Sequence, residues 1–366
     1  MFMNNLFGGG KTPQLKSTKR IGYIDAIRGF TILLVVMSHV SGFGLGFNGS
    51  NTFSYRIIVE SFFMPLFFFI SGFVLYKTDR IWTVINTWKF LVGKVSFLLV
   101  APLIFMLALS QVKGNTFIEI LFSNMKGGYW FTFSLFEYYV IYAVSRQLGF
   151  YMKFKNLVED VFLLIIGFTI YLCTIWTLME KLHMMDGIGG LFCVPNLHYY
   201  IFLVLGTLAK KHIIRFEILL ETKYFTALLI AVFIVCHLVP SLANISSTVY
   251  SFVSSLSGVL LVFAFFRYYR MKFEMNDSNN IGFIERQFIF VGRRTLDIYF
   301  IHYFLIFSNL EAVLPNMAVI NSPFIEFLMS LSISLIIVAI SLLFSSVLRI
   351  NPWLAWILFG KKIKRI

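Results

Sequence analysis

Long apolar segments recur along the chain, separated by shorter stretches that hold most of the charged residues. A helix needs about 20 consecutive, mostly apolar residues to cross the hydrocarbon core of a bilayer. Roughly ten segments have this length, so the pattern predicts an all-α integral membrane protein. The predicted spans are 24–46, 56–76, 91–110, 129–146, 161–179, 193–209, 224–239, 247–267, 295–312 and 323–347.

The composition agrees with this pattern. The 366 residues are 58% hydrophobic and 13% charged, whereas soluble domains are about 45–50% apolar and about 25% charged. These values exclude a soluble globular enzyme, a disordered chain, a disulfide scaffold and a nucleic-acid-binding module. Cys173, Cys193 and Cys236 lie in apolar sequence without the spacing of metal or redox motifs, so we expect no metal site.

The basic residues are distributed unevenly between the two sides of the predicted spans. The chain has 31 Lys and Arg against 17 Asp and Glu, a net charge of +14. With a cytoplasmic N-terminus, 26 of the 31 lie on the cytoplasmic side, four lie outside and Arg28 lies in the first span. Cytoplasmic loops collect Lys and Arg, so both termini are predicted to be cytoplasmic. We expect a tail at 1–20, a transmembrane domain over 21–350, an interfacial helix within it at 281–292, and an interfacial segment with a basic tail at 351–366 that contacts membrane lipid.

The first predicted span holds three ionisable residues, Asp25, Arg28 and His39, and such residues are costly inside a bilayer. Arg28 and His39 are eleven residues apart, which at about 100° per residue is about 20° past three full turns. They therefore share one helix face, roughly 16 Å apart along the axis. Asp25 lies one turn before Arg28 and is expected to orient it by an ion pair. Alone, Arg28 could be an interfacial anchor and His39 a histidine bonded to a carbonyl; their shared face favours function.

Four residues elsewhere are further candidates. Glu137 lies near the middle of the fourth predicted span, where it could orient His39, bind an acceptor or serve as a structural partner. His302 lies within the ninth span and is either a core histidine or a donor-site residue. Glu60 and Trp130 lie near the outer ends of their spans and are either interfacial or acceptor-binding residues.

The first span also carries a recognisable motif. RGFTILLVVMSH at 28–39, preceded by Ile-Asp at 24–25, resembles the first-helix signature of membrane-bound acyltransferase family 3. Four later segments resemble motifs of that family in order and approximate spacing. They are FFMPLFFFISGF at 62–73, YWFTFSLF at 129–136, FLVLG at 202–206 and TLDIYFIH at 295–302. The resemblance covers nearly the whole chain, and the first motif together with SGF is its most specific part.

The resemblance implies an integral membrane enzyme that moves an acyl group, often acetyl, from cytoplasmic acyl-CoA to a hydroxyl of a cell-surface glycan or glycolipid. It implies that His39 is the catalytic histidine and that Arg28 contacts the CoA donor. Acyl-CoA is a substrate, so no bound cofactor is expected. The implied location is a bacterial inner membrane. His39 would act as a general base on the acceptor hydroxyl or would itself carry the acyl group.

Positive charge at the cytoplasmic face is expected to hold the phosphates of the donor. The predicted donor-binding residues are Arg28, Asp25, Lys89, Lys94, Arg293, Arg294 and His302. Family members commonly have paired basic residues just before the Pro of the third helix, whereas apolar residues precede Pro102 here. This departure leaves the roles of Lys89 and Lys94 open.

Other classes of membrane protein share some of these features. A transporter or flippase of glycans or lipid-linked intermediates also has many spans with buried charges, but it is expected to show internal repeats or helices broken at matching positions. A polysaccharide polymerase or glycosyltransferase is expected to need a large outer loop, and the outer loops here are short. An acyl-CoA-binding subunit without acceptor chemistry would have the same first helix. Transfer of labelled acyl from CoA to a glycan distinguishes these classes.

Overall fold

The computed structural model is all-helical over the residues that it describes, where no strand occurs. The described residues are 21–45, 54–78, 80–114, 116–181, 187–239, 247–276, 282–306 and 322–360. The tail predicted at 1–20 and the basic residues at 361–366 lie outside this set.

Each predicted span contains at least one helix, and several spans are interrupted by a turn. The first half of the chain forms α1 (Gly22–His39), η1 (Val40–Gly44), α2 (Tyr55–Glu60), α3 (Phe63–Leu75), α4 (Val84–Val95), η2 (Ser96–Val100), α5 (Ala101–Lys113), α6 (Phe117–Phe122), η3 (Lys126–Gly128), α7 (Trp130–Tyr151) and α8 (Asn156–Lys181). The second half forms α9 (Ile188–Leu191), η4 (Val194–Tyr199), α10 (Tyr200–Lys211), α11 (Ile213–Glu221), α12 (Lys223–Leu238), α13 (Ser247–Asn276), α14 (Phe283–Gly292), α15 (Thr295–Leu305), α17 (Pro323–Leu348) and α18 (Pro352–Phe359). Of the short elements, η1 and η2 are π-helical turns, whereas η3 and η4 are 3-10 turns.

The chain is a multi-pass membrane protein, but the predicted count of ten spans is not confirmed. Within the described residues, six stretches are long and apolar enough to cross a membrane, and the pair α11 and α12, bent by 76°, gives a seventh if it forms one span. The six are Gly22–Gly44, Tyr55–Leu75, Val84–Lys113, Asn156–Trp176, Ser247–Arg270 and Pro323–Leu348. Helices α10 and α15 coincide with predicted spans but have only 12 and 11 residues, fewer than the about 20 of a full crossing.

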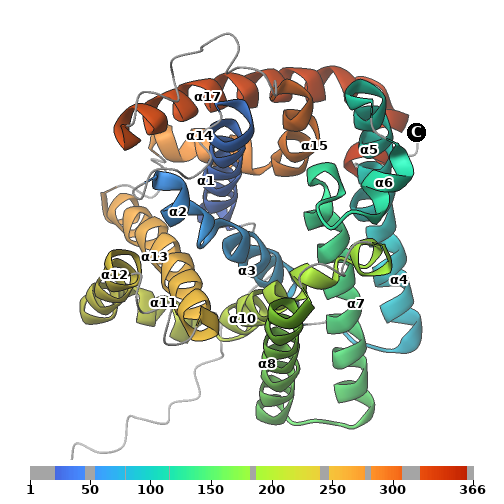
Figure 1. Cartoon of the computed structure of the whole chain (residues 1–366). Helices are drawn as coiled ribbons and strands as arrows, with labels where there is room; N and C mark the ends of the chain where they lie inside the picture. The colour runs from blue at the N-terminus through green and yellow to red at the C-terminus, as the bar shows by residue number, and fades with distance from the viewer. Residues whose placement is uncertain are drawn as a thin grey trace, which may run out of the picture.

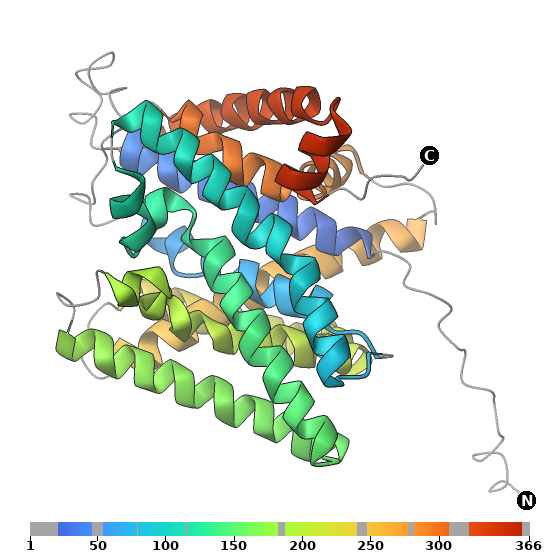
Figure 2. The same ribbon diagram turned by 90° about the vertical axis from the view of Figure 1, so that its right-hand side faces the viewer.

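The helices surround α3, which lies near the centre of the molecule in Figure 1. Helix α17 lies along one side and packs on α1 and α15. In Figure 2, α1 (blue), α7 and α8 (both green) each extend from the left side of the molecule toward its right side.

Two pairs of helices touch backbone to backbone because glycines lie at their crossings. A Cβ atom at Gly72 of α3 or at Gly206 of α10 would come within 1.9 Å of a carbonyl oxygen on the other helix. The same holds for Gly29 of α1 and Gly292 of α14, at 2.0 and 1.8 Å. Small residues allow this close approach between membrane helices. Helix α14, predicted to be an interfacial segment, therefore packs directly on α1.

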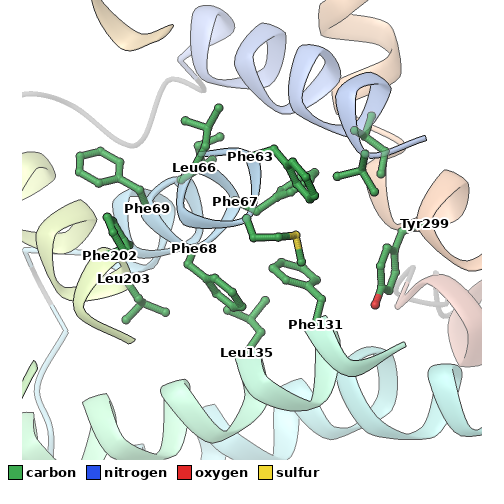
Figure 3. Close-up of a cluster of buried hydrophobic side chains, with 14 of the residues drawn as sticks. Phe63, Leu66, Phe67, Phe68, Phe69, Phe131, Leu135, Phe202, Leu203 and Tyr299 are labelled. Atoms are coloured by element: carbon green, nitrogen blue, oxygen red, sulfur yellow. The ribbon is translucent and has the colours of Figure 1, made fainter. Parts of the chain in front are cut away.

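Aromatic side chains of α3 form the core. In Figure 3 they fill the space between Phe131 and Leu135 of α7, Phe202 and Leu203 of α10, and Tyr299 of α15. Phe68 lies with its ring centroid 4.9 Å from that of Phe131, within the range of favourable aromatic pairs. The apolar run of residues 62–73 is thus buried on all sides, which explains its lack of amphipathic periodicity.

A buried lysine fixes the turn that precedes α7. Lys126 is fully buried, and its Nζ donates hydrogen bonds to the carbonyl oxygens of Leu121 and Gly190 at 2.7 and 2.6 Å. Burial lowers the pKa of this ammonium group, an effect that the nearby Cys193 and Glu137 partly oppose. The contacts tie η3 to α6 and α9 and set the position at which α7 begins.

Candidate active site

His39 is the last residue of α1, and the π-helical turn η1 begins directly after it. Such turns are rare and often lie at functional sites. The hydroxyl of Ser41, within the turn, donates a hydrogen bond to Oε1 of Glu326 on α17 at 2.6 Å, and Ser54 donates to the same oxygen at 2.9 Å. The buried Glu326 therefore holds the turn after His39 against α17 and the start of α2.

His39 lines a cavity of about 390 Å³ that we call the outer cavity. Its walls come from α1, α2, α3, α7 and α15 and are mostly apolar and aromatic, with a few polar side chains. Both the volume and this mixture are typical of small-molecule sites. Glu60 and Trp130, the two predicted acceptor-binding residues, both line the outer cavity.

The structure places His302 beside His39 rather than among the other predicted donor-binding residues. Nδ1 of His39 lies 3.1 Å from Nε2 of His302, and Nδ1 of His302 lies 3.0 Å from the carbonyl oxygen of Ile298. A carbonyl oxygen only accepts, so Nδ1 of His302 carries the proton and its Nε2, in the uncharged ring, is an acceptor. His39 then donates from Nδ1, and its Nε2 keeps a lone pair. These tautomers follow from the partners of each nitrogen.

The lone pair of His39 lies near a tyrosine that the neighbouring turn holds in place. The hydroxyl of Tyr303 is 3.5 Å from Nε2 of His39, a long contact that a substrate hydroxyl can replace. A Cβ atom at Gly128, which has φ +103°, would come within 2.1 Å of the Tyr303 ring. Tyr299 donates a hydrogen bond to the carbonyl of Gly128 at 2.7 Å. Glycine at this position therefore lets α15 pack closely on η3.

Glu60 is held in place at the wall of the outer cavity. Ser38, next to His39 in the sequence, donates a hydrogen bond from Oγ to Oε1 of Glu60 at 2.5 Å. Arg56 donates from Nε to the same oxygen at 2.9 Å, and its Nη2 is also 2.9 Å away. A carboxylate with fixed donors at one oxygen keeps lone pairs for a ligand that carries hydroxyl groups.

A second cavity of about 170 Å³, the inner cavity, lies toward the start of α1. Arg28 and Lys94 line it, together with Ser71, Tyr139 and apolar side chains of α3 and α7. The Nζ atom of Lys94 lies 5.5 Å from the ring centroid of Tyr139. The π-helical turn η2, which supplies Phe97 and Leu98 to this cavity, replaces a regular turn at the break between α4 and α5.

Arg80 adds a third cation near the inner cavity that the sequence did not single out. Its guanidinium lies 4.6 Å from the ring centroid of Phe90, and Nζ of Lys94 lies 5.6 Å from the same centroid. Nη1 of Arg80 is buried without a hydrogen-bond partner among the described residues. In the sequence Arg80 looked like any cytoplasmic-loop cation, and only the fold shows that it shares the Phe90 ring with Lys94.

The outer and inner cavities are neighbours inside the protein and share part of their lining. Phe67, Phe131, Thr295 and Leu296 line both of them. The rings of Phe67 and Phe131, with centroids 5.4 Å apart, stand between the two spaces. Arg28 and His39 thus face adjoining cavities, in keeping with the shared helix face predicted from their spacing.

The remaining donor candidates do not line the inner cavity. Asp25 makes the expected ion pair with Arg28, at 3.9 Å, and a second one with Arg293, at 3.5 Å. Arg294 donates hydrogen bonds to two serine hydroxyls of α17 at 3.1 and 3.0 Å. Lys89 is exposed on α4 and does not line this cavity.

Glu137 is not brought to His39. It lies further along α7 and lines neither the outer nor the inner cavity. Its Oε2 atom is buried without a hydrogen-bond partner among the described residues, and the carboxylate interacts electrostatically with Lys126. This position fits the structural-partner alternative for Glu137. Glu326, by contrast, contacts the turn after His39 and was not anticipated, although a carboxylate at the start of an apolar span is a usable signal.

Comparison with protein families agrees with the resemblance found in the motifs. A family model described as an acyltransferase domain, that of acyltransferase family 3, matches residues 21–350, almost the whole chain. Searches of curated proteins and of solved structures give no match. The matched range contains every residue that lines the outer and inner cavities. The chain therefore belongs to acyltransferase family 3 and is a membrane acyltransferase.

Proposed function

We propose that this protein transfers an acyl group, with acetyl the first candidate, from cytoplasmic acyl-CoA to a hydroxyl of an extracytoplasmic glycan or glycolipid. The proposed setting is a bacterial inner membrane, with both termini cytoplasmic and about ten membrane segments once α7 and the shorter helices α10, α12 and α15 are counted with the six long spans. The single observation that carries the proposal is that two chemically different cavities adjoin each other along the helix face shared by Arg28 and His39.

The inner cavity supports a donor that carries phosphate groups. Arg28 and Lys94 line it, and Arg80 stacks beside Lys94 on Phe90. Two cations that line one cavity, with a third close to one of them, are suited to a polyanion, because charge-assisted hydrogen bonds to phosphate are among the strongest in proteins. With the CoA phosphates held there, the pantetheine arm would extend past Phe67 and Phe131 toward His39.

The outer cavity supports general-base chemistry at His39. Nε2 of His39 takes the proton of the acceptor hydroxyl as its oxygen attacks the thioester carbonyl. The carbon–sulfur bond then breaks, and the leaving thiolate takes the proton back from the His39 imidazolium. His302 accepts the Nδ1–H of His39 throughout, which orients the ring and stabilises its charged form. Glu60 would hold a second hydroxyl of the acceptor.

The proposal is tested by transfer of label from acetyl-CoA. Membrane vesicles that contain wild-type protein, His39→Ala or Arg28→Ala are given radiolabelled acetyl-CoA, and label is counted on the membrane glycan. We expect His39→Ala to lose about 10²- to 10⁴-fold in rate and Arg28→Ala to need more acetyl-CoA. Lys89→Ala, at an exposed cation, is the matched control. Full transfer by correctly inserted His39→Ala would exclude both the base and the acyl-histidine versions.

A further inference from the structure

A third cavity, of about 310 Å³, adjoins the outer cavity and has no role in the chemistry described above. Its walls come from α2, α8, η4, α10, α12 and α13, and it shares Glu60 and Tyr199 with the outer cavity. A molecule that fills the third cavity would therefore touch the same carboxylate as one bound next to His39.

The two histidines in this cavity present hydrogen-bond acceptors. Nδ1 of His198 lies 2.8 Å from the carbonyl oxygen of Pro195, and Nδ1 of His237 lies 2.8 Å from that of Phe233. Because a carbonyl oxygen cannot donate, both Nδ1 atoms carry hydrogens, and Nε2 of each uncharged ring keeps a lone pair. Glu60 adds carboxylate oxygens to the same cavity.

A buried hydroxyl in the third cavity has no hydrogen-bond partner among the described residues. Ser254 is 2% exposed, and its Oγ makes no hydrogen bond to any described residue. Buried polar side chains are nearly always paired, so an unpaired one indicates that something else supplies the partner. The hydroxyl of Ser254 can both donate to and accept from a ligand.

The charge of the third cavity differs from that of the inner cavity. Among the described residues that line it, none is Lys or Arg, and its carboxylate, Glu60, is already paired with Arg56 outside the lining. This environment disfavours phosphate and carboxylate ligands and favours groups that donate hydrogen bonds without charge, as hydroxyls do. The rings of Tyr171, Tyr199 and Phe202 supply apolar faces beside these acceptors. A sugar ring, with hydroxyls at its edge and C–H groups on its faces, matches both features.

We propose that the third cavity binds the sugar residues next to the one that is acylated, so that the acceptor is an oligosaccharide chain rather than an isolated small alcohol. This inference rests on the proposed function. Glu60 lies where the two acceptor subsites join, and Ser254, His198 and His237 form the polar wall of the added subsite.

The experiment compares acceptors of different length. Envelope glycan from the source cells is partly hydrolysed and separated into fragments of one sugar residue and of three. Their kcat and KM are measured with saturating radiolabelled acetyl-CoA for the wild type, His237→Ala and Ser254→Ala. The ring of His237 bonds only to its own helix among the described residues, so its removal leaves the fold intact. Ile234→Ala, at an exposed site on the same helix, is the matched control.

We expect the wild type to have a lower KM for the longer fragment. Each variant should raise that KM by about two- to tenfold, the effect of one lost hydrogen bond, with unchanged kcat and unchanged kinetics on the single sugar. If the variants and the control have the same KM for the longer fragment while His39→Ala abolishes transfer, the third-cavity proposal fails and the proposed function stands. If the wild type labels neither fragment, the proposed function fails first.

Discussion

Replacing His302 by Phe tests whether the histidine pair sets the protonation of His39. His302 is completely buried, and its Nε2 accepts the hydrogen bond from Nδ1 of His39 over 3.1 Å. Phe keeps the shape of a planar ring at this place but removes the acceptor. Nδ1–H of His39 then loses its acceptor, which keeps the lone pair of His39 on Nε2 and directed into the outer cavity.

The expected loss follows from that one hydrogen bond. A donor left without a partner in a buried site costs roughly 1–3 kcal/mol. At about 1.36 kcal/mol for each factor of ten in rate, kcat should fall about 5- to 150-fold. The loss should be smaller than that of His39→Ala, because the base itself remains. The KM for acetyl-CoA should stay unchanged, since His302 lines neither cavity.

Steady-state transfer from radiolabelled acetyl-CoA measures both constants. His302→Gln is the partner variant, because its amide oxygen can accept from Nδ1 of His39 and should restore part of kcat. His212→Phe makes the same change at a half-exposed histidine that pairs with Asp160, and it should have no effect on transfer. A normal kcat with a raised acetyl-CoA KM in His302→Phe would refute the reasoning and return His302 to the donor site predicted from sequence.

Three further predictions concern the walls of the cavities and the turn before α7. Arg28→Ala should raise the acetyl-CoA KM by roughly 10- to 150-fold, since hydrogen bonds to charged groups contribute about 1.5–3 kcal/mol; an effect no larger than that of Lys89→Ala would contradict this role. Phe67→Ala should join the two cavities and admit water to the thioester, so hydrolysis of acetyl-CoA to acetate and free thiol should rise relative to transfer, while core truncation lowers stability by about 3–5 kcal/mol. Unchanged thiol release would argue against a partition at Phe67. Lys126→Met should lower the thermal midpoint through loss of two carbonyl contacts and leave the acetyl-CoA KM unchanged, and a normal midpoint would contradict a structural role.

Much of the architecture could be predicted from local sequence. Apolar segments long enough to span a bilayer identified the helices, and the helical period placed Arg28 and His39 on one face. The count of spans was less predictable, because α10 and α15 are short helices whose apolar residues are buried by neighbours rather than by lipid. Hydropathy responds to both kinds of burial in the same way.

Contacts within the candidate site were predictable only where both partners lie on one helix. The pairing of His39 with His302 joins residues 263 positions apart, and no periodicity within a helix reports such a contact. For the same reason Lys89 and Lys94, close together in the sequence, were given one role although only Lys94 faces the inner cavity. Glu137 was predicted to be a site residue from its depth in a span. Its electrostatic neighbour is Lys126, which the turn before α7 brings close to it, and no pattern within the span indicates that contact.

The sidedness of transfer tests the central claim most directly. Sealed inverted vesicles expose the cytoplasmic face, so radiolabelled acetyl-CoA is added outside and the glycan of the opposite face lies in the lumen. The account predicts label on glycan that resists glycan-degrading enzymes until detergent opens the vesicles, and its absence with His39→Ala. Label on luminal glycan that persists at the wild-type rate in His39→Ala, or wild-type label confined to glycan outside the vesicles, would contradict it.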